Sequence, residues 1–272
     1  MSETIHWTHL DGSLASLQAG VGPRIVFVHG FTQTGTSWGH VAETFTGDHH
    51  VTLIDAPGHG RSTAIRADLS RGADLIAEVG GPALYVGYSM GARFVLHVAL
   101  AHPQLLHGLV LLGGTAGLVT ERERIERRAA DDALAAQIEA DGVGEFLRRW
   151  LASPLFATLP DDAKGLDDRS TNTSAGLASS LRLAGLGTQR PLWDQLSTIA
   201  APTLVMAGDL DSKFSALGRQ MADAIGANAS FRAIEAAGHA AHLEHPAAVV
   251  STMREWMTLH GLNPRTETAG RR

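Results

Sequence analysis

Two features of the 272-residue sequence predict an α/β fold with a mostly parallel central sheet. First, short apolar runs that end in turn residues alternate with helix-like segments, which is typical of parallel strands covered by helices on both faces. Second, the alternation is interrupted between residues 119 and 199 by a segment with only helix-like patterning. We therefore predict a helical cap inserted between two strands of the sheet, where long insertions often form lids or binding elements.

The expected strands are apolar runs that lead directly into glycine, proline or polar residues. They occupy residues 24–30, 50–60, 83–89, 108–114, 202–209 and 230–239, and the helix-like segments between them are 39–47, 66–79, 90–101 and 215–226. An opening hairpin is also expected, with its turn at Asp11 and Gly12. In a parallel sheet of this kind, ligands bind at the carboxyl ends of the strands.

The same pattern divides the chain into a core and a cap. We assign residues 1–118 and 200–261 to the core and residues 119–199 to the cap. Within the cap, the sequence predicts helices at 120–140, 143–152, 161–168 and 175–196. Residues 262–272 are polar and contain proline and glycine, so we expect them to form a disordered tail.

The composition argues against several classes of function. The net charge of −6 gives no support for nucleic-acid binding, and the absence of cysteine excludes disulfides, thiol catalysis and cysteine-ligated metals. The amino terminus has no secretory signal pattern, and no apolar stretch approaches the ~20 residues of a membrane span. We therefore expect a soluble, cytoplasmic protein. Its oligomeric state, including a homo-oligomer, stays open.

The stretch GYSMG, residues 87–91, has the spacing Gly-x-Ser-x-Gly between an expected strand and an expected helix. Small residues flank Ser89 because the turn from strand to helix is sharp, and such a turn exposes the serine hydroxyl above the sheet. The alternative is an ordinary glycine turn whose serine caps a helix. The strand-to-helix context favours a catalytic serine.

A histidine must accept the serine proton, because a serine hydroxyl alone is a weak nucleophile or base. His239 follows the last expected strand, after a glycine that permits close approach. His242 and His245 repeat at three-residue spacing and raise the alternative of a metal site, but zinc would need further ligands. Nothing in the nearby sequence requires a metal, and we predict none.

An acid should orient His239. The loop after the fifth expected strand, GDLDSKF, contains Asp209 and Asp211, in the chain order serine, aspartate, histidine. Asp211 lies deeper in the loop and has the spacing Gly-x-x-Asp, so we prefer it to Asp209.

Negative charge that develops on a substrate needs backbone N–H groups aimed at it. Met90, directly after Ser89, should supply one of them. Phe31, in the loop HGFTQTG after the first parallel strand, should supply the other. The alternative for HGF is a simple turn after a strand.

Arg93 lies four residues after Ser89, on the same face of the expected helix and one turn away. A cation in the first turn of a helix opposes the helix dipole by about 0.3–1 kcal/mol. Its presence is explained if an anion binds beside the serine, held by the guanidinium and by the helix terminus. The alternative is a solvated surface arginine.

The cap adds further cations. Arg127 lies on an expected helix, where Asp131 is one of the acids placed to pair with it. On the physics of the sequence alone, a solvated, ion-paired helix is the favoured interpretation. Trp150, Arg169 and Lys213 are ambiguous when each is considered alone, and Trp150 has the alternative role of anchoring the cap to the sheet.

The motifs together carry two resemblances. Over nearly the full chain, the sequence resembles the α/β-hydrolase superfamily in the order of HGF, DAPGHGRS, GYSMG, GDLD and AGH. It also resembles the 2-succinyl-6-hydroxy-2,4-cyclohexadiene-1-carboxylate synthase family of menaquinone biosynthesis in VGYSMGAR, GLVTERERIERR, RRWLASPLFATL, RSTN, GLGTQRPLWDQL, GDLDSKF and AGHAAHLEHP. The first resemblance implies an α/β-hydrolase fold with a catalytic triad. The second implies a lyase that eliminates pyruvate from a cyclohexene precursor with three carboxylates.

The second resemblance also implies roles for individual residues. The triad falls on Ser89, Asp211 and His239, the carboxylate-binding arginines on Arg93, Arg127 and Arg169, and further pocket positions on Tyr88, Trp150 and Lys213. It implies a small-molecule polycarboxylate substrate and no metal or organic cofactor. A serine hydrolase of the same fold, cleaving an ester or C–C bond in a small acidic substrate, is the alternative. Whether Ser89 or His239 takes the substrate proton stays open.

Overall fold

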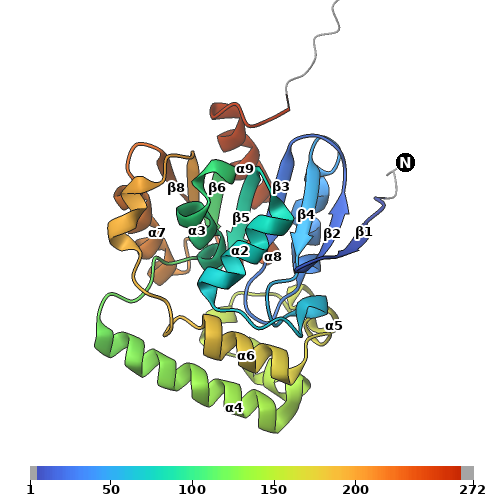
Figure 1. The fold of residues 1–272 in the computed structure, drawn as a ribbon, viewed down its shortest axis with the longest axis vertical. Coiled ribbons are helices and arrows are strands. Elements are labelled where there is room, and N and C mark those ends of the chain that lie inside the picture. Colours follow the sequence, from blue (N-terminus) through green and yellow to red (C-terminus); the bar gives the residue numbers. More distant parts are fainter. Residues whose placement is uncertain (1–4, 265–272) are drawn as a thin grey trace, which may run out of the picture.

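The computed structural model describes residues 5–264 and is built on an eight-stranded sheet in the order β1-β2-β4-β3-β5-β6-β7-β8 (Figure 1). The strands are β1 Thr8–Asp11, β2 Ala15–Ala19, β3 Arg24–Val28, β4 His50–Ile54, β5 Ala83–Tyr88, β6 Leu106–Leu112, β7 Thr203–Gly208 and β8 Ala229–Ile234. β2 runs antiparallel to β1 and β4, whereas the other neighbouring pairs are parallel. The prediction of a mostly parallel sheet is confirmed.

The central strands are apolar along their whole length because helices cover both faces of the sheet. Every residue of β5 and β7 is buried. At the two edges, β1 is exposed throughout and β8 is only partly buried. The edge position explains why the last strand has the weakest apolar pattern.

Two layers of helices cover the sheet (Figure 1). One face packs against α2 (Leu69–Gly80), α3 (Met90–Ala101) and α7 (Ser212–Ile225), and the other against α1 (Gly39–Ala42), α8 (Ala241–Glu244) and α9 (Pro246–Leu259). Short 3₁₀ helices occupy Gly35–Trp38, Glu43–Phe45, Gly60–Ser62 and Pro103–Leu105. Strand residues alternate between the two layers, so that Val26 joins the first apolar core and Phe27 the second.

The segment between β6 and β7 is helical and lies across the carboxyl ends of the strands (Figure 1). It contains α4 (Glu121–Leu151), α5 (Leu166–Arg169) and α6 (Ser174–Ala184), with 3₁₀ helices at Pro154–Phe156, Asp161–Ala163 and Trp193–Thr198. α4 breaks at Gly142, whose φ is 80° and ψ is 165°, so the two helices expected at its ends adjoin across this break. α4 and α6 pack around their own apolar cluster, which includes Ile138 and Leu177.

The helix expected over residues 175–196 ends at Ala184. Two glycines and Pro191 follow, and these residues disfavour a helix interior. A Cβ atom added at Gly187 would lie 2.3 Å from the backbone nitrogen of Arg128. The chain therefore needs glycine there in order to pass against α4.

The two ends of the chain differ in detail from the expectation. The hairpin forms, but Asp11 pairs with Ala15, so its loop contains three residues beginning with Gly12. At the other end, Leu262 packs against the second apolar core, and its N–H donates to the Met257 carbonyl at 2.9 Å. The rest of the tail that the sequence predicts, residues 265–272, lies outside the described residues. Within the described chain, no helix combines the length and apolar character needed to cross a bilayer.

Candidate active site

Ser89 lies in a sharp turn between β5 and α3. Its backbone has a positive φ of 52°, a strained conformation for a residue with a side chain. A Cβ atom added at Gly87 would lie 2.5 Å from the Gly91 carbonyl oxygen, and one added at Gly91 would lie 2.1 Å from the Val28 oxygen. Both glycines are therefore required by close backbone approach. The Ser89 N–H donates to the Leu112 carbonyl at 2.8 Å, which ties the turn to β6.

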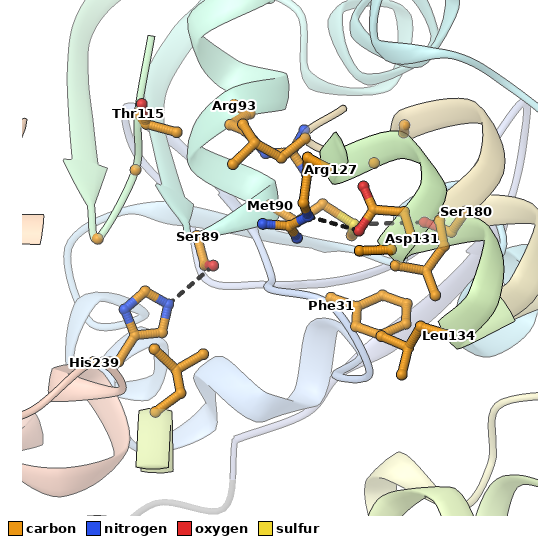
Figure 2. Close-up of a pocket in the computed structure, with 18 of the residues that line it drawn as sticks. Phe31, Ser89, Met90, Arg93, Thr115, Arg127, Asp131, Leu134, Ser180 and His239 are labelled. Atoms are coloured by element: carbon orange, nitrogen blue, oxygen red, sulfur yellow. Dashed lines mark hydrogen bonds and ion pairs between the residues drawn. The ribbon is translucent and has the colours of Figure 1, made fainter. Parts of the chain in front are cut away.

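A triad assembles above this turn. His239 Nε2 lies 3.1 Å from Ser89 Oγ, and His239 Nδ1 lies 2.8 Å from Asp211 Oδ2 (Figure 2 shows the first contact). Asp211 also accepts the Phe214 N–H at 3.2 Å as the N-cap of α7. Asp209 is exposed. The structure thus brings together the preferred aspartate, the histidine and the serine in a geometry that can move the serine proton to the imidazole.

Met90 and Phe31, the two residues whose N–H groups the sequence predicts to face an anion, both lie beside Ser89. Met90 is the first residue of α3, where the helix leaves N–H groups without intrahelical partners. Phe31 follows β3 at the same edge of the sheet, and both residues line one cavity with Ser89 and His239. The helix dipole adds partial positive charge at this point.

The cavity has a volume of about 540 Å³ and lies between the sheet edge and the cap. Its cationic residues are Arg93 from the core, Arg127 from the cap, and Lys213 from the start of α7. Figure 2 shows Arg93 and Arg127 close together, across the cavity from His239. Burial lowers the pKa of Arg93 to about 10, and the positive charge of Arg127 is the second cause. The Arg93 guanidinium is therefore still charged at neutral pH. The pairing of a triad with two adjacent cations can hold an anion next to a proton acceptor.

Trp150 forms part of the same cavity wall. Its ring meets the Phe31 ring edge-on at 5.7 Å, and its buried Nε1 makes no hydrogen bond within the described chain. Lys213 is exposed, with its Nζ 5.6 Å from the Phe214 ring centroid. Both side chains line the cavity, and their part in substrate binding stays a prediction.

Tyr88 and Arg169 lie outside the residues that line the cavity. Tyr88 is buried behind the triad, with its ring 5.4 Å from that of His239, and burial raises the pKa of its hydroxyl. Arg169 is only 2% exposed; it donates to the Lys164 carbonyl at 2.7 Å and to the Thr32 hydroxyl. The structure does not bring these two side chains together with Arg93 and Arg127.

Comparison with known proteins shows the family of this chain. A model of the alpha/beta hydrolase family matches residues 25–252. The 2-succinyl-6-hydroxy-2,4-cyclohexadiene-1-carboxylate synthase of Salmonella agona (strain SL483) is 35% identical over 263 residues, which cover 94% of this chain and 99% of that protein. The chain belongs to the alpha/beta hydrolase family, in the branch of these synthases.

Solved structures support the family assignment. MenH from S. aureus is 28% identical, with a TM-score of 0.84, and the match covers 94% of this chain and 99% of that one. A thermophilic esterase from Thermogutta terrifontis has a TM-score of 0.80 at 22% identity, again over 94% of this chain and 99% of its own. The likeness to the esterase shows the shared fold alone.

A carboxylate that the sequence does not single out fixes the backbone around His239. Glu244 Oε2 accepts the Gly238 N–H at 2.7 Å, and Oε1 accepts the Ala240 N–H at 3.0 Å. One carboxylate therefore fixes the backbone on both sides of His239. The only available signal was an acid five residues after the histidine in GHAAHLEHP.

His242 and His245 do not join the triad. His242 is buried against the Tyr88 ring, with a centroid distance of 4.2 Å, and burial lowers its pKa well below 6.5. His245 Nε2 lies 3.1 Å from the Ala236 carbonyl. Within the described chain, no group of three or more potential metal-ligating side chains is present.

Side chains of the cap orient the two cavity arginines. Arg127 Nε donates to Asp131 Oδ1 at 2.8 Å, which leaves the terminal amino groups of the guanidinium for another partner. Arg93 Nη1 donates to Gln189 Oε1 at 3.4 Å. The sequence favours an ion-paired Arg127, and the pair with Asp131 does form. Both residues, however, line the cavity. The sequence does not single out Gln189, because the resemblance carried by GLGTQRPLWDQL assigns this residue no role.

Proposed function

We propose that this chain is a carbon–oxygen lyase of menaquinone biosynthesis, a 2-succinyl-6-hydroxy-2,4-cyclohexadiene-1-carboxylate synthase. Its substrate is 2-succinyl-5-enolpyruvyl-6-hydroxy-3-cyclohexene-1-carboxylate, which carries three carboxylates. One observation carries the proposal: Arg93 and Arg127 share a cavity with Ser89 and His239. Simple ester hydrolysis does not require two cations beside the serine, whereas a substrate with several carboxylates does. The synthase relative supports this choice.

The cavity suits such a substrate in size and charge. Its volume of about 540 Å³ falls within the roughly 300–1,000 Å³ typical of small-molecule sites. Arg93 and Arg127 offer planar guanidinium groups, which bind a carboxylate through two parallel hydrogen bonds. Lys213, exposed beside Phe214, offers a third positive charge. In this proposal each of these three side chains binds one carboxylate of the substrate.

Proton abstraction starts the reaction. His239, oriented by Asp211, draws the proton from Ser89 Oγ, and the serine oxygen then removes the proton from the ring carbon that bears the succinyl group. The histidine is needed because the unperturbed basicity of serine is poorly matched to neutral pH. Direct abstraction by His239 is the alternative route.

Elimination follows from that step. Electrons from the broken C–H bond form one ring double bond, the existing double bond shifts, and the C–O bond to the enolpyruvyl group breaks. The leaving group is the enolate of pyruvate, which takes up the proton held by His239 and becomes pyruvate. Meanwhile the N–H groups of Phe31 and Met90 stabilise negative charge on the succinyl carbonyl oxygen. The step forms no acyl-enzyme and uses no metal or organic cofactor.

The proposal extends to the cap and to the compartment. We assign residues 119–199 as a cap that contributes Arg127 and Trp150 to substrate binding. We also place the reaction in the cytoplasm, because a cysteine-free sequence suits a reducing compartment and the substrate is a small metabolite.

Pyruvate release tests the function directly. Purified protein is incubated with the enolpyruvyl precursor, and pyruvate is followed with a coupled dehydrogenase while the ring diene is followed by its ultraviolet absorbance. We expect both products to form at equal rates. If simple aryl esters were hydrolysed rapidly and no pyruvate appeared, the chain would be a serine hydrolase of the same fold.

A further inference from the structure

Thr32 lies in the loop after β3, directly after Phe31, the proposed anion-stabilising residue. Its φ is 70°, a left-handed conformation that β-branched residues adopt only under strain. Strain of this kind persists where the surrounding structure over-determines the backbone, and it is concentrated at functional sites. The question is what holds Thr32 in place.

All three polar groups of Thr32 are bound by side chains. Its N–H donates to His59 Nε2 at 3.3 Å, its carbonyl accepts from Asn172 Nδ2 at 2.8 Å, and its hydroxyl accepts from Arg169 Nη1. We call His59, Arg169 and Asn172 the Thr32 clamp. Thr32 and His59 are fully buried, and Arg169 and Asn172 are 2% and 5% exposed.

Two members of the clamp come from the cap and are themselves fixed. Arg169 Nε donates to the Lys164 carbonyl at 2.7 Å, and Asn172 accepts the Gly60 N–H at 2.8 Å. Both known partners of the Arg169 guanidinium are neutral oxygen atoms, so its charge strengthens the bond to Thr32 without the competition of an ion pair. The cap therefore binds the core loop through Arg169 and Asn172, which lie 137 and 140 residues after Thr32 in the chain.

His59 completes the clamp as a fixed acceptor. Its Nδ1 donates to the Pro57 carbonyl at 3.0 Å, which leaves Nε2 to accept the Thr32 N–H. The His59 ring also meets the Phe31 ring edge-on at 5.7 Å. The clamp thus touches Thr32 and its neighbour Phe31 together.

We propose that the Thr32 clamp holds the Phe31 N–H in position, and that Arg169 is a positioning residue which acts through Thr32. The peptide unit that joins Phe31 to Thr32 ends at the Phe31 Cα atom, so a displacement of Thr32 also displaces Phe31 and, with it, the N–H of that residue. A donor that stabilises charge only in the transition state affects kcat, because the ground state makes little use of it. The inference rests on the proposed function, since it assigns Arg169 a place in that reaction.

Two variants separate positioning from substrate binding. Thr32→Val removes the hydroxyl and keeps the side-chain shape, and Arg169→Met removes the guanidinium. We expect each to lower kcat by about 10- to 100-fold, the cost of a small displacement of a catalytic group, with KM changed by less than about twofold. An arginine that binds a substrate carboxylate would instead raise KM. Thr32→Ser, which keeps the hydroxyl, should retain most of the activity.

The double variant gives the sharper result. If Arg169 acts through Thr32, Thr32→Val combined with Arg169→Met should be no slower than the slower single variant. Arg182→Met, which removes a cap arginine paired with Glu139 at the surface, is the control and should leave kcat and KM unchanged. Multiplicative losses in the double variant, or a raised KM with unchanged kcat in Arg169→Met, would overturn the proposal.

A measurement without substrate keeps the inference separate from the function. Amide hydrogen exchange of Thr32, whose N–H bonds to His59, should accelerate at least about tenfold in Arg169→Met and Thr32→Val, while the β5 amides stay protected. Should Thr32→Val fail to fold, Asn172→Ala takes its place, because it opens the carbonyl side of the clamp. Unchanged exchange rates would refute the clamp even if pyruvate is released. A chain that releases no pyruvate but shows the faster exchange would refute the function and leave the clamp standing.

Discussion

The two sides of the cavity are built by different means. On the triad side, each member of the triad follows a strand, and its position is set by the backbone, as at Ser89, whose N–H bonds to β6. On the cationic side, Arg93 and Arg127 are long side chains oriented by other side chains, Gln189 and Asp131. The first side belongs to the core alone, whereas the second joins core and cap.

This difference shows how the fold divides its tasks. Proton transfer needs a fixed geometry, and backbone turns at a sheet edge supply one. Charge recognition depends on which cations face the cavity, and the cap can change these while the turn at Ser89 stays intact. The alpha/beta hydrolase fold can therefore keep one triad and accept chemically different substrates.

Loss of the serine should have the largest effect and tests the triad side. Ser89→Ala is expected to reduce kcat for pyruvate release by roughly 10³-fold or more, as the removal of a triad member does in related chemistry. Single-turnover kinetics measure this loss. A variant that retains near-normal kcat would show that His239 takes the substrate proton directly.

Loss of Arg93 tests the cationic side. Arg93→Met should lower kcat/KM by about 10²-fold, since a buried charged hydrogen bond contributes about 1.5–3 kcal/mol. Steady-state kinetics with the precursor give the value, and Arg182→Met serves as the matched control because its guanidinium pairs with Glu139 outside the cavity. Hydrolysis of an uncharged aryl ester, if any, should be unaffected by Arg93→Met. An equal loss for both substrates would mean that Arg93 supports the fold and not the anion.

Glu244 tests whether backbone positioning dominates on the triad side. Glu244→Ala leaves the Gly238 and Ala240 N–H groups without their acceptor and should lower kcat by about tenfold, with little change in KM. Glu244→Gln keeps one acceptor oxygen and should lose less. Equal kinetics for both variants and the parent would contradict this role.

The acid sensitivity of the fold should show the smallest effect. In the folded chain the pKa of His59 is lowered from 6.5 to about 3, and burial of the ring is the main cause. The unfolded chain therefore binds more protons between these values, and stability falls as pH drops through that window by about 1.4 kcal/mol per pH unit from this group. Urea unfolding at pH 7, 6 and 5 measures the slope. His59→Gln should flatten it, and an unchanged slope would show that another group is responsible.

The sequence was informative wherever local geometry decides the outcome. The turn at Ser89 needs small residues on both sides, and the positions of Asp211 and His239 follow from the ends of their strands. The sequence alone therefore predicts that these three residues meet, and in the structure they are in contact. The alternation of strands and helices likewise identified the sheet.

Long-range contacts between side chains left no such signal. Gln189 reaches Arg93 across 96 residues, and Asn172 reaches Thr32 across 140. Both residues lie in stretches that carry the family resemblance, RSTN and GLGTQRPLWDQL, but the resemblance does not say which side chain each residue contacts, so only the fold shows what it does. Arg169 is the instructive case, because the resemblance implies a substrate ligand and the structure places its guanidinium on Thr32. The role of Arg169 stays a prediction until the kinetics distinguish substrate binding from the positioning of Thr32.

The break at Gly142 divides α4 into an arm that carries Arg127 and an arm that carries Trp150. A continuous helix would couple the two residues rigidly, since each added residue turns everything beyond it by about 100°. With the break, an insertion in the first arm rotates Arg127 away from the cavity and leaves Trp150 facing it. Changes confined to the first arm can thus alter which substrate charge the cavity prefers, while Trp150 keeps its place in the cavity wall.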